Sequence, residues 1–193
     1  MSVKNKGKLI IFSAPSGSGK TTLAKHILDN IDNISFSISA CSREARAGEL
    51  NGVDYYFFST DDFKQKIEEG AFIEWEEVYK DHFYGTLAYE VENIRSKGNH
   101  VLFDVDVVGG TNIKKQFGDE ALAIFVRPPS IEVLVERLTA RSTDSQEAID
   151  TRIKKAEYEL SFEDQFDVTI VNDDLETAKR QTLKIVNDFI NLD

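Results

Sequence analysis

Short apolar runs alternate with amphipathic segments along this chain. Apolar runs predict strands at residues 9–12, 101–105, 121–126 and 168–171, and alternating apolar and hydroxyl residues predict another at 34–38. Apolar residues that return every three or four positions predict helices at 87–97, 131–141 and 175–192, and another that carries Leu23, Ala24, Ile27 and Leu28 on one face. This alternation favours an α/β fold with a mostly parallel sheet flanked by helices.

Two segments interrupt the alternation. Residues 41–86 are rich in aromatic and acidic side chains, and residues 141–162 are polar with spaced arginines. Neither a repeat nor a low-complexity linker divides the chain, so we expect one domain. Insertions at the carboxyl ends of strands usually carry substrate contacts and lids, which is the role we expect here.

Composition narrows the class of protein. The chain has 193 residues, of which 41% are hydrophobic and 30% charged, and no apolar run is long enough to span a membrane. The first residues lack the apolar stretch of a signal peptide, and the single cysteine, Cys41, cannot form an internal disulfide. A net charge of −11 argues against nonspecific nucleic-acid binding. We therefore expect a cytoplasmic protein with neither membrane nor nucleic acid as partner.

A glycine-rich turn follows the first predicted strand and precedes the first helix. Its sequence from residue 14 to residue 22 is APSGSGKTT. Strand, turn and helix N-terminus in this order aim backbone N–H groups at one point, which suits a nucleoside triphosphate. The residues expected to hold its phosphates are Ala14, Pro15, Ser16, Gly17, Ser18, Gly19, Lys20, Thr21 and Thr22.

The chemistry of this turn divides among four of its residues. Gly17 and Gly19 let the backbone curl around an anion, Lys20 supplies a compact positive charge, and the Thr21 hydroxyl can ligate magnesium. Ala14 stands where the general pattern has its first glycine, so this position must have negative φ or tolerate a methyl group. The alternative is a turn that only joins a strand to a helix.

Five sequence blocks together resemble one family. The second block is R-x-x-R-x-G-E-x-x-G-x-D-Y from Arg43 to Tyr55, followed by FIEW at 72–75 and YGT at 84–86. The others are the phosphate loop, FDVD at 103–106, the arginines of the second interruption and IVNDD at 170–174. In this order and spacing they closely resemble guanylate kinase over essentially the whole chain. The resemblance implies a P-loop NTPase fold with a core (1–38, 87–140 and 163–193), a mixed α/β GMP-binding insertion (about 39–86) and a lid (about 141–162).

The resemblance also implies a reaction and its residues. The reaction is the reversible, Mg²⁺-dependent transfer of the ATP γ-phosphate to GMP or dGMP, in purine nucleotide metabolism and GMP recycling. Two guanidinium forks and two phenols suit a phosphate clamp, and carboxylates suit the N–H donors of guanine. The residues that match the family's GMP contacts are Ser39, Arg43, Arg46, Glu49, Tyr55, Glu74, Tyr84, Thr86, Asp104 and Asp106.

Arginines around the second interruption match the family's lid. Arg137, Arg141 and Arg152 are expected to reach the transferring phosphoryl group together with Lys20 and Arg43. The GMP phosphate is already a nucleophilic dianion near neutral pH, so no protein base is required. Two further matches are Asp104, which would contact magnesium through its bound water, and Asn172, which would lie near the adenosine of ATP.

Each assignment has a structural alternative. The two arginines of the second block could be a solvated face, Glu74 an outward strand residue, Asp104 a helix cap, and the lid arginines part of a charged helix pair. Departures from the family pattern are Ala14, Cys41, Ala45 and Val108.

Two other classes of protein remain open. One is a guanylate-kinase-like binding module that holds phosphopeptides, although such modules degrade the phosphate loop and lid. The other is a different P-loop enzyme, such as a kinase for another nucleotide or a GTPase, although no N-K-x-D motif is present. Monomer and homo-oligomer are equally compatible with the sequence.

Overall fold

A computed structural model of the protein describes residues 6–141 and 146–192. The chain divides into two compact units. The phosphate-loop unit comprises residues 9–34 with residues 102–141 and 146–192, and the insertion unit comprises residues 6–8 and 35–101. Each unit is described by itself.

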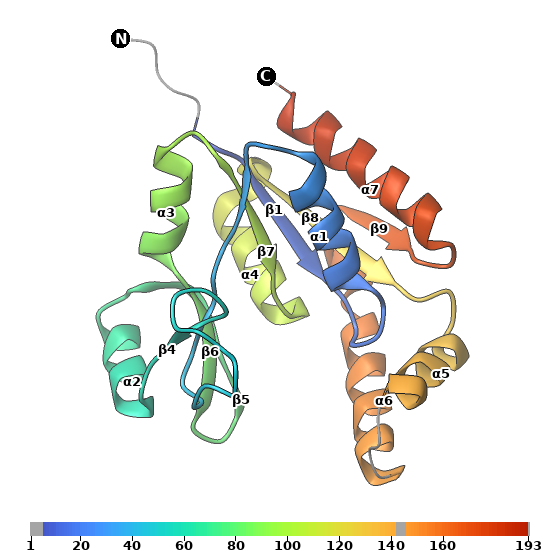
Figure 1. Ribbon diagram of the computed structural model, residues 1–193, viewed down its shortest axis with the longest axis horizontal. Helices are drawn as coiled ribbons and strands as arrows, with labels where there is room; N and C mark the ends of the chain where they lie inside the picture. The colour runs from blue at the N-terminus through green and yellow to red at the C-terminus, as the bar shows by residue number, and fades with distance from the viewer. Residues whose placement is uncertain (1–5, 142–145, 193) are drawn as a thin grey trace. The chain divides into compact units, whose positions relative to one another are not determined.

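The phosphate-loop unit is built from helices on strands (Figure 1). Its elements are β1 (Leu9–Ser13), α1 (Lys20–Asn30), α4 (Val107–Phe117), η1 (Gly118–Glu120), β8 (Ala121–Arg127), α5 (Ile131–Arg141), α6 (Gln146–Leu160), η2 (Glu163–Gln165), β9 (Val168–Val171) and α7 (Leu175–Ile190). Strands β2 (Ile34–Phe36) and β7 (His100–Asp104) cross the boundary between the units.

Parallel pairing organises the larger sheet, whose strand order is β2-β7-β1-β8-β9. Strand β1 pairs with β8 and β8 with β9, both parallel. Buried Ile10 and Phe12 of β1 join one core cluster with Leu23 of α1 and Val186 of α7, and these two helices lie side by side in Figure 1. Helix α4 contacts β1 and β8, and its own Val107 and Ile113 are buried.

The insertion unit has a smaller sheet and an aromatic core. Its elements are β3 (Ala40–Cys41), β4 (Tyr56–Phe57), α2 (Thr60–Glu68), β5 (Phe72–Tyr79), β6 (His82–Leu87) and α3 (Ala88–Ser96). The strand order is β4-β3-β6-β5, with β5 and β6 antiparallel. Phe63 is fully buried and stacks on Phe72 and Phe83, with ring centroids 4.4 and 5.6 Å away. This cluster holds α2 against the sheet.

Most predicted elements lie where the apolar pattern placed them. The differences are strand 34–38, which ends at Phe36, and the elements that the pattern did not predict, which are α4 and the helices and strands of the two interrupting segments. Helix α4 has two adjacent glycines, which weaken its intrinsic helix propensity. It forms because the Asp106 side chain caps its N-terminus and because Val107 and Ile113 are buried.

Candidate functional site

The phosphate loop has the backbone shape that its sequence predicts. Gly17 and Gly19 have φ angles of 90° and 92°, a left-handed region that strains other residues. Asp81 is the only non-glycine residue with positive φ in the described part of the chain, so Ala14 needs no left-handed backbone. The loop therefore tolerates alanine at the position where the general motif has glycine.

Lys20 begins α1 and faces the end of β7. Its ammonium group pairs with the Asp104 carboxylate and donates to the carbonyl of Val105 at 3.1 Å. The Thr21 hydroxyl lies 3.5 Å from the other Asp104 oxygen. A hydroxyl and a carboxylate beside a phosphate loop are the hard oxygen ligands that Mg²⁺ prefers, so these residues fit a magnesium-bound nucleotide.

The residue that caps α4 is Asp106, whereas the sequence analysis considered Asp104 as a possible helix cap. Its carboxylate accepts a hydrogen bond from the Gly109 N–H at 2.7 Å, at the N-terminus of α4. Its backbone carbonyl accepts from the Ser13 hydroxyl at 2.9 Å. Both aspartates thus lie at the carboxyl end of β7, at the same edge as the phosphate loop that follows β1.

Asn172 connects the phosphate loop with Arg137. Its side-chain amide donates to the carbonyl of Ser18 at 2.7 Å, and its backbone carbonyl accepts from the Arg137 guanidinium at 3.0 Å. Of the other lid arginines, Arg152 lies on an exposed part of α6, and the side chain of Arg141 lies outside the described residues. Among the described side chains, the structure therefore places Arg137 on the residue that contacts the loop.

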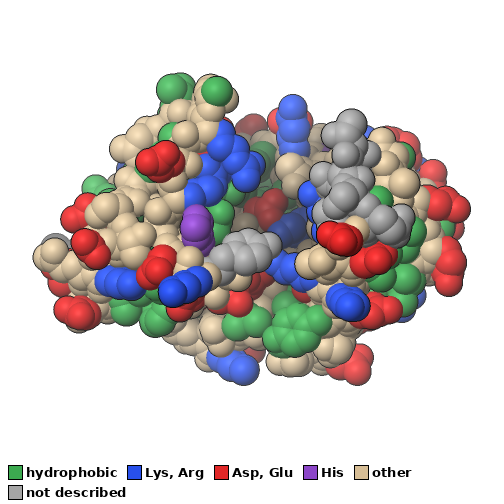
Figure 2. Space-filling model, turned by 90° about the horizontal axis from the view of Figure 1, so that it is seen from below, with side chains coloured by type: hydrophobic (Ala, Val, Ile, Leu, Met, Phe, Trp, Pro, Cys, Tyr) green, Lys and Arg blue, Asp and Glu red, His purple; other side chains and the backbone are tan. Residues whose placement is uncertain are grey.

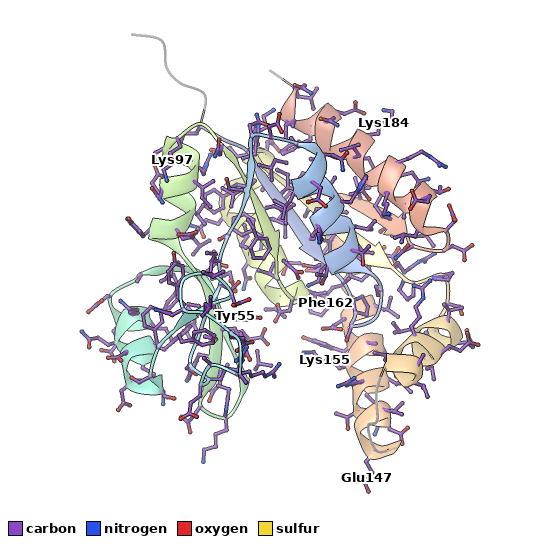
Figure 3. The ribbon with its side chains drawn as sticks, viewed as in Figure 1. Tyr55, Lys97, Glu147, Lys155, Phe162 and Lys184 are labelled. Carbon is purple, nitrogen blue, oxygen red and sulfur yellow. The ribbon has the colours of Figure 1, made fainter. Side chains whose placement is uncertain are left out.

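Glu159 is a charged residue near the loop that the sequence analysis missed. Its side chain is only 8% exposed, and Lys155 of α6 lies 3.9 Å away. Burial raises the pKa of this carboxyl, although Lys155, Lys20 and a hydrogen bond from the Ser16 N–H act to lower it. The sequence did contain a signal for this burial. Glu159 lies three residues after apolar Ala156, so both residues are on the same face of α6. Figure 3 shows this helix with Lys155 labelled.

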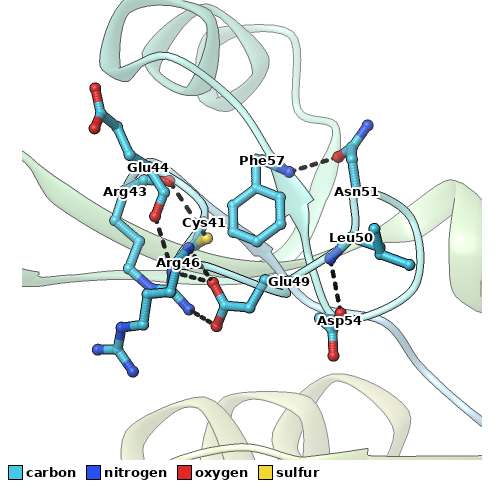
Figure 4. Close-up of polar contacts among 9 residues, drawn as sticks. All are labelled: Cys41, Arg43, Glu44, Arg46, Glu49, Leu50, Asn51, Asp54 and Phe57. Carbon is cyan, nitrogen blue, oxygen red and sulfur yellow. Dashed lines mark hydrogen bonds and ion pairs between the residues drawn. The ribbon is translucent and has the colours of Figure 1, made fainter.

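The insertion unit presents an arginine held in a fixed orientation (Figure 4). The Arg43 guanidinium donates to both oxygens of Glu49 at 2.6 and 2.7 Å. Glu49 also accepts from the backbone N–H of Arg46 at 2.7 Å, whereas the Arg46 side chain is exposed. These hydrogen bonds hold the pKa of Glu49 at about 2. The carboxylate therefore keeps its charge at all physiological pH values, and it aims the arginine.

Two tyrosines flank this arginine. The Arg43 guanidinium lies 5.0 Å from the ring centroid of Tyr55, which is labelled in Figure 3, and 5.5 Å from that of Phe57. Tyr84 packs edge-on against Tyr55 at 6.2 Å and hydrogen-bonds to Arg43. Glu49 is the main reason why the pKa of Arg43 is raised further above its usual range. A cation and two phenols thus converge, as an anion site requires.

A carboxylate and a hydroxyl meet on the sheet of the same unit. Glu74 and Thr86 are directly opposite on β5 and β6, and the Thr86 hydroxyl donates to the Glu74 carboxylate at 2.6 Å. Thr86 is 1% exposed, and Ser39 is half-buried before β3. These side chains can accept hydrogen bonds from a planar base. Asp104 and Asp106 belong to the phosphate-loop unit.

Comparisons with known proteins identify the family of the chain. The family model described as guanylate kinase matches residues 6–191. The guanylate kinase of Bacteroides thetaiotaomicron is 57% identical, with 96% of this chain and 91% of that protein covered. The guanylate kinase of Porphyromonas gingivalis is 52% identical, with coverage of 95% and 98%.

A solved structure supports the same assignment. The crystal structure of guanylate kinase from Anaplasma phagocytophilum superposes with a TM-score of 0.77 at 29% identity. The superposition covers 97% of this chain and 88% of the chain in that crystal structure. The predicted α/β P-loop fold is therefore confirmed. With a family model that spans nearly its whole length and with relatives of this identity, the chain belongs to the guanylate kinase family.

Proposed function

We propose that this chain catalyses the reversible, Mg²⁺-dependent transfer of the γ-phosphate of ATP to GMP or dGMP, giving ADP and GDP. The observation that carries the proposal is that one chain retains both Lys20 in an intact phosphate loop and the Arg43–Glu49 pair. Membership of the family places this reaction in purine nucleotide metabolism. The roles of the individual residues below are part of the proposal.

The phosphate loop holds the donor. Backbone N–H groups of the loop residues other than Pro15 surround the ATP phosphates, and Lys20 contacts the outer ones. The residues that would hold the magnesium ion are Thr21 and, through a bound water, Asp104. When bound, Mg²⁺ supplies positive charge that offsets the negative charge developing on the phosphates.

The insertion unit holds the acceptor. Arg43, Arg46, Tyr55 and Tyr84 clamp the GMP phosphate, while Glu49 keeps Arg43 in the orientation that the clamp needs. The residues that contact the rest of GMP are Ser39, Glu74, Thr86, Asp104 and Asp106. A base that lacks the N–H donors of guanine could not donate the same hydrogen bonds to the Glu74 carboxylate, and this would disfavour AMP.

The chemical step needs positioning and charge rather than a base. The GMP phosphate has a pKa near 6, so at neutral pH it is mostly a dianion that can attack the γ-phosphorus directly. Arg137, Arg141 and Arg152 stabilise the charge of the in-line transition state together with Lys20 and Arg43. Lid closure over the site excludes water, which would otherwise accept the phosphoryl group.

The regions of the chain and its location in the cell are part of the same proposal. We place the GMP-binding region at about 39–86, the lid at about 141–162 and the core in the remainder. Acidic and basic side chains are interspersed on the face shown in Figure 2, which suits small substrates better than nucleic acid. We assign the protein to the cytoplasm.

Within residues 6–141 and 146–192, none of the helices combines the length and the apolar character that a membrane span requires.

A coupled assay of ADP release tests the proposal. ATP and magnesium are supplied with GMP, AMP, CMP or UMP, and a blank omits the acceptor. Turnover confined to GMP is expected. Turnover with another monophosphate would contradict the roles of Glu74 and Asp106, and absence of turnover with every acceptor would favour a phosphopeptide-binding module.

A further inference from the structure

Asn172 follows β9 and is almost fully buried, with 6% of its surface exposed. Its backbone N–H donates to the carbonyl of Arg127 at 2.8 Å, which extends the β8–β9 ladder by one bond. Its backbone carbonyl accepts from Arg137 and its side-chain amide donates to Ser18. A single residue therefore contacts the sheet, an arginine of α5 and the phosphate loop.

The amide of Asn172 is wedged against the loop backbone. A Cβ atom added to Gly19 would lie 2.1 Å from the amide nitrogen, so only glycine leaves room for it. An amide nitrogen donates and cannot accept, so the group that faces the Ser18 carbonyl must be the NH₂. Ser18 itself is completely buried. If the Asn172 amide were removed, no water could take its place as the donor to the Ser18 carbonyl.

We propose that Asn172 is a positioning residue for the phosphate loop. Its amide holds the Ser18 carbonyl, and this orients the adjacent N–H groups of the loop toward the donor phosphates. The inference rests on the proposed kinase function and deepens it. It gives the side chain a role toward the phosphates of any donor, in place of the contact near adenosine that the family resemblance implies.

The backbone carbonyl of Asn172 also connects the phosphate loop with Arg137 of α5. Because the Arg137 guanidinium binds the carbonyl of Asn172 while the amide binds Ser18, the arginine and the loop share one fixed point. Substitution of the side chain removes only the loop contact, since the backbone carbonyl that Arg137 uses is retained. The two contributions are therefore separable by experiment.

The first test compares a nucleotide with a phosphate chain that has no base. Dissociation constants for Mg²⁺–ATP and for Mg²⁺ with inorganic tripolyphosphate are measured by calorimetry for the wild type and Asn172→Ala. Both are expected to rise by the same factor, about 10-fold, with GMP binding unchanged. A loss confined to ATP, or no loss for either, would overturn the proposal.

A matched control is available at the other end of the unit. The Asn191 amide also donates to a backbone carbonyl, that of Asn187 at 2.8 Å, but it is exposed. Asn191→Ala should leave both dissociation constants unchanged. An equal loss in this variant would show that the effect is a general consequence of removing such a bond.

A second variant keeps the proposal testable if the alanine variant folds poorly. In Asn172→Asp the carboxyl has nearly the volume of the amide, but it can donate to Ser18 only when protonated. Its tripolyphosphate affinity relative to the wild type should therefore recover as the pH falls from about 8 to about 5. A ratio that does not change with pH would contradict a donor role.

Turnover of the wild type with GMP separates the two proposals. If the wild type shows no turnover while donor binding depends on Asn172 as described, the kinase function fails and the positioning role stands. If the wild type turns over GMP and donor binding is indifferent to Asn172, the positioning role fails alone.

Discussion

The two anion sites that we propose, one in each unit, are built from different materials. In the phosphate-loop unit the site is mainly backbone, held by a buried parallel sheet, by two glycines with positive φ and by the Asn172 amide. In the insertion unit it consists of side chains, with Arg43 aimed by Glu49 and stacked on Tyr55. A backbone site depends on loop shape, whereas a side-chain site depends on charge pairs, so the two should respond differently to substitution.

The largest expected effect separates catalysis from acceptor binding. Lys20→Met removes the charge that faces the donor phosphates, and kcat should fall by at least about 1000-fold. GMP binding, measured by calorimetry, should persist because the Arg43 clamp is intact. Lys184→Met, at an exposed lysine of α7 paired with Asp188, is the control and should retain full activity. Loss of GMP binding in Lys20→Met would remove the distinction between the two units.

The acceptor clamp should show the opposite pattern. Arg43→Met leaves Glu49 without its guanidinium partner, and the KM for GMP should rise by about 100-fold while the KM for ATP changes little. Lys64→Met, which breaks an exposed pair with Asp81 in the same unit, should change neither constant. Equal changes in both Michaelis constants would argue that Arg43 supports the fold rather than the acceptor.

Base selectivity tests the sheet of the insertion unit. Glu74→Ala removes the acceptor that Thr86 also contacts, so the preference for GMP over AMP, as a ratio of kcat/KM values, should fall by about 10-fold or more. The matched control is Glu77→Ala on the same strand, which is exposed and lies opposite Phe83. An unchanged ratio in Glu74→Ala would assign Glu74 to the structure of the sheet.

The smallest expected effect is the pH dependence of the Arg43–Glu49 pair. The pKa of Glu49 is lowered from 4.5 to about 2, chiefly by its hydrogen bonds with Arg43. A lowered pKa in the folded state adds stability that is fully present above about pH 4.5 and is lost as the pH falls to about 2.

Thermal unfolding of the wild type and Glu49→Gln measures this contribution. The wild type should have the higher Tm at pH 6, and the difference should vanish as the pH approaches 2. A difference that stays constant over this range would mean that Glu49 acts through packing and not through its charge.

Local patterns accounted for the phosphate loop because its chemistry is local. Gly17, Gly19, Lys20 and Thr21 are consecutive or nearly so, and a strand before them and a helix after them set the backbone. Helix α4 was missed because its own sequence favours no helix. Its cap at Asp106 and its burial against β1 and β8 decide its conformation.

Part of the candidate site in the insertion unit could be predicted from the sequence for a similar reason. Glu49 lies six residues from Arg43 and the sequence block contains both, so their partnership follows from a single loop. Glu74 and Thr86 are twelve residues apart, and only the antiparallel register of β5 and β6 brings them within 2.6 Å. The resemblance to the family indicates both residues without that register.

The sequence by itself determined the family, the α/β fold and the loop that would hold a nucleoside triphosphate, because these depend on neighbouring residues and on apolar periodicity. Tertiary structure alone decided that Glu159 is buried beside the loop and that the Asn172 amide holds Ser18 across 154 positions. Such contacts depend on which elements pack together. The amino-acid sequence alone does not give the distance between two residues that are far apart along the chain.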